Sequence, residues 1–338
     1  MTELRNMLAE TAGKVLRAEG LDWPKVAESG LCNVMVPEAA GGFGGGWEDA
    51  LPVLRQIGAT AAALPIAETI IANRLCAACG LEIDSAPGSF VTLADGDVGE
   101  DHNFSGVLSN IPWEDRAERI VGRAQQKDDA YLLVLRREDS KARTEQRNVA
   151  GEPRGALKFE NAKIEMARWP QSESHGFTQM GALARTCQIA GALGAVLDMT
   201  IEHAKTRQQF GRAIGNFQAI QQQLAIFASE SAAVGAAAAA ACAAADRREA
   251  GFEIAAAKLR ANRAVDIATN VAHQVHGAIG ITAEHALHRY TQRLWSWKSE
   301  FGNDRKWAME LGTVVAARGA DNLWGDITGL RNDARKAG

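Results

Sequence analysis

Apolar residues divide the chain into three stretches that differ in the spacing of their hydrophobic positions. In residues 1–84 the apolar side chains recur every three or four positions, which predicts helices. In residues 85–172 this period is lost, and short apolar runs alternate with turn and charged residues, which predicts strands. The helical period returns in residues 173–338. This order predicts an α+β fold with an N-terminal helical domain, a small middle β domain and a C-terminal four-helix bundle.

The individual runs predict the elements. Strands are expected at four apolar runs of the middle domain: residues 90–93, 120–124, 130–135 and 156–159. We expect a turn at 104–106 and a short extended piece at 29–38. Long helices are expected at 180–203, 214–248, 251–275, 284–297 and 304–317. No Gly-x-Gly-x-x-Gly follows a strand, so the sequence does not predict a nicotinamide site of that type.

Composition narrows the class of partner. Hydrophobic residues make up 46% of the chain and charged residues 23%, with a formal net charge of −4, which offers no basic surface for nucleic acid. We expect neither a signal peptide nor a membrane span, and place the protein in the cytoplasm. The five cysteines are an odd number, which argues against a disulfide framework. Cys76 and Cys79 are interpreted as buried structural residues rather than a redox pair.

Two breaks in the helical bundle carry candidate chemistry. Residues 274–282 contain Gly277 and Gly280, which let a ligand approach the backbone and suit a phosphate or a pyrophosphate at a helix end. The alternative interpretation is a plain turn between helices. The nearby histidines are interpreted as helix-face or loop residues rather than metal ligands, and no metal site is expected: His273, His276, His285 and His288.

The other break places an arginine, an aromatic residue and a glycine within five positions: Arg207, Phe210 and Gly211. Arg207 has a fixed charge with five donors, which suits phosphate oxygens. Gln218 follows in the next helix and can both donate and accept hydrogen bonds. A solvated surface turn is the alternative.

Together these segments resemble the acyl-CoA dehydrogenase family, through Arg207-x-x-Phe210-Gly211 with Gln218, and Gln274-x-x-Gly277-Ala278-x-Gly280. The resemblance covers nearly the whole chain and implies FAD as cofactor. It implies that Arg207, Phe210 and Gln218 reach the flavin nucleotide of a neighbouring subunit. It also implies that Gln274, Gly277 and Ala278 hold its ADP half, with Ala278 in place of the family's second glycine. A cofactor shared in this way implies a dimer or a dimer of dimers, or a hetero-oligomer with a related subunit.

The resemblance also assigns flavin contacts outside these two breaks. Leu93 falls where the family has a strand beside the flavin, and Ser109 where a hydroxyl bonds the edge of the flavin ring. Asn303, after the last candidate catalytic segment, is a further cofactor-binding candidate.

Dehydrogenation of an acyl thioester needs a base for the α proton, and we expect a carboxylate whose pKa is raised toward neutrality by burial. One of the two places that the family uses matches about Ala184, where this chain has no acid. The other falls on Phe301 when counted without a gap and on Glu300 with a one-residue shift. We take Glu300 as the candidate base, with a surface glutamate near Lys298 as the alternative.

Arg185 matches an arginine that the family often has under the active site. We name it as a catalytic candidate, with a salt bridge to Glu300 or Asp304 as an equal alternative.

The resemblance implies an FAD-dependent enzyme that makes a 2,3-enoyl-CoA from an acyl-CoA and passes electrons to an electron-transferring flavoprotein. The acyl group is open, and bulky ones such as steroid side chains are a hypothesis from the short middle domain. The alternative is a non-catalytic subunit that completes the FAD site of a catalytic partner. The shortness of the chain, Ala278, the thin β domain and the shift at Glu300 favour that alternative. A flavin desulfinase or monooxygenase on the same scaffold is a third hypothesis.

Overall fold

The computed structural model describes residues 3–92, 94–99, 101–126, 129–170, 173, 175–247 and 249–328. Helices of the N-terminal part are α1 (Glu3–Leu16), α2 (Trp23–Glu28), α3 (Trp47–Thr60) and α4 (Ile66–Ala78). Two 3₁₀ turns, η1 (Leu31–Asn33) and η2 (Glu38–Ala40), lie between α2 and α3. The extended piece expected at 29–38 is therefore wrong. Gly30 begins the first turn with a φ of 70°, which bends the chain where an extended strand would have continued.

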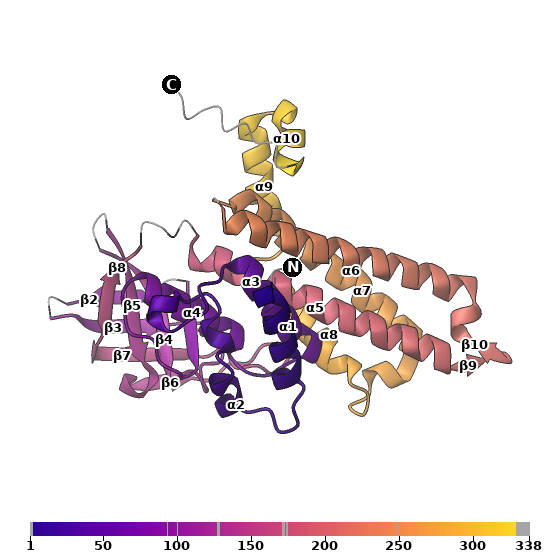
Figure 1. The fold of residues 1–338 in the computed structure, drawn as a ribbon, viewed down its shortest axis with the longest axis horizontal. Helices are drawn as coiled ribbons and strands as arrows, with labels where there is room; N and C mark the ends of the chain where they lie inside the picture. Colours follow the sequence, from indigo (N-terminus) through magenta and orange to yellow (C-terminus); the bar gives the residue numbers. More distant parts are fainter. Residues whose placement is uncertain are drawn as a thin grey trace.

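Strands of the middle part form two four-stranded sheets (Figure 1). One has the order β1 (Gly88–Val91), β4 (Arg119–Gln126), β5 (Asp129–Arg136) and β8 (Glu165–Arg168). The other has the order β2 (Asp95–Val98), β3 (Asn103–Leu108), β7 (Ala156–Lys163) and β6 (Ala142–Thr144), with η3 (Arg137–Asp139) following β5. Residues from both sheets pack into one apolar cluster that includes Phe104, Leu133 and Phe159.

The turn expected at 104–106 is wrong, because these residues lie inside β3. The register against β7 shifts between Phe104 and Gly106, as in a β-bulge. A Cβ on Gly106 would lie 2.6 Å from the Cα of Gly96 on the neighbouring strand. The glycine therefore allows close approach of two strands and does not mark a chain reversal.

The C-terminal part is helical, as expected. Its helices are α5 (Phe177–Thr206), α6 (Gln218–Ala245), α7 (Gly251–His276), α8 (Leu287–Ser299), α9 (Asp304–Arg318) and α10 (Leu323–Thr328). Short 3₁₀ turns are η4 (Ile214–Asn216), η5 (Gly277–Ile281) and η6 (Ala320–Asn322), and β9 (Gln208–Gln209) with β10 (Arg212–Ala213) forms a hairpin. In Figure 1 this hairpin projects from one end of the bundle, and α9 and α10 rise from its side.

Helix α5 joins the bundle to the N-terminal helices. A Cβ on Gly58 of α3 would lie 1.9 Å from the carbonyl oxygen of Gln188, and one on Gly191 of α5 would lie 1.9 Å from that of Arg55. The two helices therefore pack backbone against backbone, and their apolar residues belong to one core. Asp246, at the end of α6, accepts hydrogen bonds from the backbone N–H groups of Trp47 (2.7 Å) and Glu48 (2.8 Å), which caps the start of α3.

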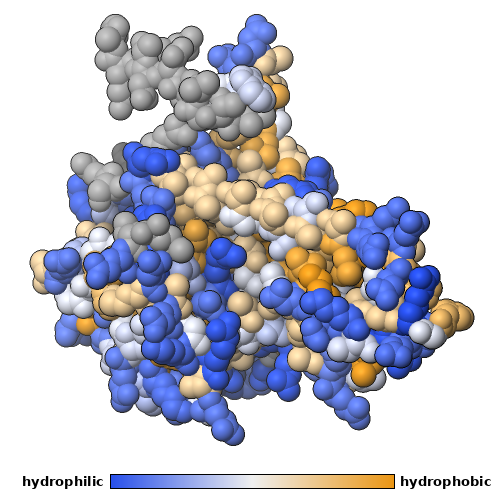
Figure 2. All heavy atoms as spheres, turned by 45° about the vertical axis from the view of Figure 1, so that its right-hand side comes forward, coloured by the Kyte–Doolittle hydropathy of each residue, from blue (hydrophilic) through white to orange (hydrophobic). Residues whose placement is uncertain are grey.

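By length and composition, α5 and α6 are each apolar enough to cross a membrane. The apolar window of α5 is 83% buried inside the protein, as expected for a core helix, whereas that of α6 is only 22% buried. The buried residues of α6 lie on one side: Phe227, Val234, Ala238, Ala241, Cys242 and Ala244. Figure 2 shows an apolar band across the bundle face.

Candidate active site

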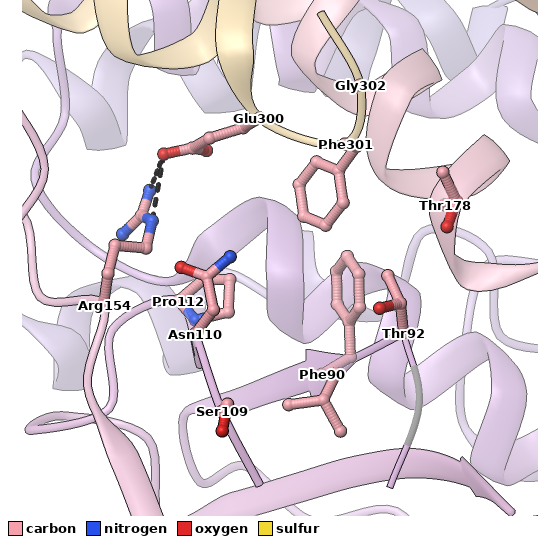
Figure 3. Close-up of a pocket in the computed structure, with 11 residues that line it drawn as sticks. Phe90, Thr92, Ser109, Asn110, Pro112, Arg154, Thr178, Glu300, Phe301 and Gly302 are labelled. Carbon is pink, nitrogen blue, oxygen red and sulfur yellow. Dashed lines mark hydrogen bonds and ion pairs between the residues drawn. The ribbon is translucent and has the colours of Figure 1, made fainter. Parts of the chain in front are cut away.

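A pocket of about 250 Å³ lies between the middle and C-terminal parts of the chain (Figure 3). From the middle domain, Phe90 of β1 lines it together with Ser109, Asn110 and Pro112. From the C-terminal part, Thr178 of the first turn of α5 and residues 300–302 of the turn after α8 line it. In Figure 3 the side chains of Glu300 and Arg154 meet on one side of the pocket, and the rings of Phe301 and Phe90 on the other. The pocket therefore has a charged wall and an aromatic wall.

Both oxygens of Glu300 are held by hydrogen bonds from cationic or amide donors. Arg154 donates to Oε1 from Nε (2.9 Å) and Nη2 (2.6 Å), and Asn148 donates to the same oxygen (3.0 Å). Arg185 donates from Nε to Oε2 (2.7 Å). The side chain is only 14% exposed, so the alternative of a surface glutamate is wrong.

Burial opposes the charged form of Glu300, but the charges of Arg185 and Arg154 and the hydrogen bond from Asn148 outweigh it and lower the pKa to about 2. The expectation that the pKa of this carboxyl is raised toward neutrality is wrong. Desolvation alone would have raised it, and the sequence did not reveal the second arginine.

Arg185 extends the charge network into the N-terminal domain. Its guanidinium is 2% exposed and donates to Glu68 of α4 (2.5 Å) and to Gln188 (2.6 Å) as well as to Glu300. The salt bridge to Glu300 that was the alternative interpretation of Arg185 is present.

On the other side of Glu300, Arg154 also binds Glu152 (3.1 Å), which pairs with Arg293 of α8 (3.0 Å). Six side chains thus alternate in charge across the three domains: Glu68, Arg185, Glu300, Arg154, Glu152 and Arg293. Removing one member would leave an uncompensated buried charge.

Phe301 forms the aromatic wall. Its φ of 55° is uncommon for a residue other than glycine. The ring stacks on Phe90 with centroids 5.2 Å apart, and Phe90 stacks on Phe177 at the same distance. A Cβ on Gly181 of α5 would lie 2.5 Å from the Phe301 ring, so the absence of a side chain there makes room for it. The position that the ungapped count gives to the base is thus occupied by a packed phenyl ring.

A second group of candidate residues lies at the end of the bundle that carries the β9–β10 hairpin. Phe210 is at the hairpin tip, 90% exposed, with a φ of 52°, and Gly211 follows with a φ of 79°. Such a pair of positive φ values is the geometry of a tight two-residue hairpin turn. Arg207, at the end of α5, and Gln218, which begins α6, are exposed.

The loop at residues 274–282 lies at the same end of the bundle and completes this group of candidates. Gln274 is exposed in the last turn of α7, and η5 begins at Gly277 with a φ of 63°. No atom lies within 4 Å of the place where a Cβ on Gly277 would stand, and Ala278 is exposed. The side chains of Arg207, Gln218 and Gln274 make no hydrogen bond with any residue that the structure describes. The geometry therefore fits an external ligand with phosphate groups.

Imidazole rings pack beneath this loop. His276 is 4% exposed, and its Nδ1 donates a hydrogen bond to the carbonyl of Ala272 (2.8 Å). The centroid of its ring lies 4.6 Å from the ring centroid of His203 and 4.8 Å from that of His285. Burial is the main cause that lowers the pKa of His276 to about 4, so the ring is neutral near pH 7. Over the residues that are described, no group of three His, Cys, Asp or Glu side chains is arranged to hold a metal ion.

Known proteins similar to this chain are acyl-CoA dehydrogenases. A family model described as the acyl-CoA dehydrogenase C-terminal domain matches residues 174–299. Acyl-CoA dehydrogenase FadE27 of Mycobacterium tuberculosis is 27% identical over 307 residues, which cover 79% of this chain and 80% of that protein. The chain is therefore similar to acyl-CoA dehydrogenases over most of its length, and residues 174–299 match the C-terminal domain of that family.

Solved structures agree with this assignment in fold. The crystal structure of the ChsE4–ChsE5 complex from Mycobacterium tuberculosis matches with a TM-score of 0.78 at 21% identity and covers 94% of this chain and 98% of that chain. The structure of PigA with FAD and proline matches with a TM-score of 0.78 at 15% identity, over 94% and 99% of the two chains. The predicted α+β fold is confirmed.

Of the remaining flavin candidates, Ser109 lies in the pocket. The side chain of Asn303 instead caps α9, where its Oδ1 accepts a hydrogen bond from the N–H of Lys306 (3.1 Å). Leu93 lies outside the described residues.

Sequence reasoning missed several residues of the site: Glu68, Phe90, Asn148, Arg154 and Gly181. Glu68 carried a usable signal, because it is a charged residue in the apolar first half of α4 and such residues are almost never buried unless paired. Asn148 and Arg154 carried none, since both lie in the irregular segment between β6 and β7.

Proposed function

We propose that this chain is an FAD-binding subunit of an acyl-CoA dehydrogenase complex in which a related subunit supplies the catalytic base. The observation that carries the proposal is the occupancy of the base position. Phe301 stands there as a stacked ring, and the neighbouring Glu300 is bound by Arg154 and Arg185. A carboxylate whose pKa is held near 2 is a poor acceptor for the α proton of a thioester.

The size of the pocket supports the same conclusion. Its volume of about 250 Å³ is below the range of roughly 300–1,000 Å³ usual for ligand pockets. The stacked rings of Phe90, Phe177 and Phe301 fill the space beside it. An acyl chain would have to displace that stack, so we infer that the substrate of the complex binds in the partner subunit.

FAD is the cofactor that the exposed end of the bundle fits. Arg207 would pair with its phosphate oxygens, Gln274 and Gly277 would offer donors to its ADP half, and Phe210 would pack against its apolar parts. FAD bound there would supply an acceptor for the hydride that leaves the β carbon of the acyl group. These residues lie on the surface of the chain rather than around the pocket, so a neighbouring subunit has to provide the rest of the cofactor site.

Exposed apolar surface supports an oligomer. Phe210 projects with no cover, and the outward face of α6 includes Ile226, which is 52% exposed. Among the solved structures of this fold, ChsE4–ChsE5 is itself a complex. A complex of that kind would take an acyl-CoA as substrate and an electron-transferring flavoprotein as electron acceptor. The fatty or steroid nature of the acyl group remains a hypothesis to be tested by turnover on both classes.

Visible absorption of the purified chain tests the proposal. We expect a colourless protein that acquires the flavin spectrum only when it is co-purified with the related subunit. The complex should then be bleached by an acyl-CoA under anaerobic conditions. A yellow protein, purified alone and bleached by an acyl-CoA, would refute the assignment as a non-catalytic subunit.

A second candidate function is an independent dehydrogenase with Glu300 as base, since the Glu300 carboxylate does line the pocket. Glu300→Gln separates the two functions. We expect the variant complex to keep its FAD and its turnover. Retained FAD with turnover lost by several orders of magnitude would instead identify Glu300 as the base.

A further inference from the structure

A buried lysine of α7 forms hydrogen bonds with the backbone next to the turn that carries Glu300 and Phe301. Lys258 is fully buried, and its ammonium donates to Asn262 Oδ1 (2.7 Å), to the carbonyl of Trp297 (2.7 Å) and to that of Lys298 (3.1 Å). Three acceptors are the number that a protonated ammonium group satisfies. Two of them are carbonyls of the last turn of α8, which have no partner within the helix.

Asn262, one helical turn further along α7, holds the other side of the same turn. Its Nδ2 donates to the carbonyl of Gly302 (3.5 Å), which also accepts from the indole N–H of Trp307 (3.1 Å). Lys258 and Asn262 therefore contact the backbone before Glu300 and after Phe301. Between these anchors the chain holds Phe301 at its positive φ.

The charge of Lys258 suits the end of a helix. In the part of the chain that the structure describes, its ammonium hydrogen-bonds only to neutral oxygens. A cation at the C-terminus of α8 is favoured by the helix dipole. The charged groups around it are Glu300 in the turn and Asp304 of α9, which favour its protonation, and Arg185 of α5 and Lys298 of α8, which oppose it. Burial is the largest influence and lowers the pKa of Lys258 to about 7.

We propose that Lys258 and Asn262 are positioning residues that fix the turn 299–303, and through it the place of Glu300 between its arginines and of Phe301 on Phe90. Neither side chain lines the pocket, and Asn262 reaches a lining residue only through the carbonyl of Gly302. The proposal concerns the geometry of this chain and holds whichever subunit supplies the base. Helix α7 thus has two roles in the proposal: its first half holds the turn through Lys258 and Asn262, and its last turn carries the cofactor-binding candidate Gln274.

Hydrogen exchange of the full chain, followed by mass spectrometry over peptides that contain residues 299–303, tests the proposal. We expect Lys258→Met to speed exchange in this segment on the order of tenfold, since each lost hydrogen bond removes about that much protection, while α5 stays protected. Lys298→Met is the matched control, because Lys298 pairs with Asp266 at the surface and should leave the segment unchanged. A folded Lys258→Met protein with wild-type exchange over 299–303 would overturn the proposal.

The wild-type protein offers a second readout that does not depend on whether the variant folds. Above pH 7 the lysine becomes a neutral amine with one donor fewer, so protection of 299–303, corrected for the intrinsic pH dependence of exchange, should fall as the pH rises. Asn262→Ala should weaken protection on the Gly302 side while leaving this pH profile in place. A wild-type profile that is flat between pH 6 and about 9 would refute the role of the ammonium.

Discussion

The pocket and the hairpin end of the bundle differ in how their polar groups are satisfied. Around the pocket, six buried charges alternate in sign, and both oxygens of Glu300 have donors from the same chain. At the hairpin end, Arg207, Gln218 and Gln274 are exposed and Phe210 stands uncovered. The first region is complete within one chain, whereas the second has the character of a surface that another molecule completes.

Removing the central arginine should have the largest effect. Arg185→Met leaves Glu68 and Glu300 as buried carboxylates without their shared cation, which should lower the free energy of unfolding by about 3–5 kcal/mol. Urea denaturation measures this change. Arg263→Met on the exposed face of α7 is the control and should stay within about 0.5 kcal/mol. A cost for Arg185→Met as small as that of the control would show that the network does not stabilise the fold.

Low pH should destabilise the folded chain, because protonation of the buried His276 ring opposes folding. Its pKa is lowered from 6.5 to about 4 in the folded chain, so the unfolded chain binds more protons between these values. The free energy of unfolding should therefore decrease by about 2–3 kcal/mol in total as the pH drops from 6.5 to 4.

Thermal unfolding at each pH measures the effect of His276, with His276→Gln as the comparison. The pKa values of His203 and His273 are also lowered, so the variant should lose only part of the slope. The two proteins are compared between pH 6.5 and about 5, because the pKa of Glu300 moves from 4.5 to about 2 and its contribution to stability begins to be lost as the pH falls toward 4.5. An unchanged slope in His276→Gln would contradict the assignment.

Two glycines of α5 should respond in opposite directions to the same substitution. Gly181→Ala places a methyl group 2.5 Å from the Phe301 ring, which should lower the free energy of unfolding by about 1–3 kcal/mol. Gly194→Ala has no atom within 4 Å and should raise it by roughly 0.5–1 kcal/mol. Calorimetric unfolding of both variants measures the difference, and a gain in stability for Gly181→Ala would show that the aromatic wall is loosely packed.

Phe210→Ala should have the smallest effect on the unfolding of the single chain, within about 0.5 kcal/mol, because the ring is 90% exposed. Its effect should appear only on assembly, as a loss of flavin absorbance from the purified complex. Met7→Ala, another exposed apolar residue, on α1, is the control for a general loss of surface hydrophobicity. Full flavin content in the Phe210→Ala complex would remove the hairpin from the cofactor site.

Much of the fold could be predicted from periodicity. The helix expected at 251–275 is observed as Gly251–His276, and the one at 304–317 as Asp304–Arg318. The two errors, at 29–38 and 104–106, both involve glycines whose role depends on neighbours distant in sequence. Periodicity reports which face of an element is apolar, but it does not report how closely two backbones approach.

The order of helices and strands, the two breaks in the bundle and the family resemblance could all be inferred from the amino-acid sequence, because each depends on residues close together in the chain. The protonation state of Glu300 was decided by the tertiary structure. Its carboxylate receives hydrogen bonds from Arg154 and Arg185, which are 146 and 115 residues away. Burial alone raises the pKa of a carboxyl, whereas neighbouring cations lower it. Only the folded chain brings these two arginines next to Glu300.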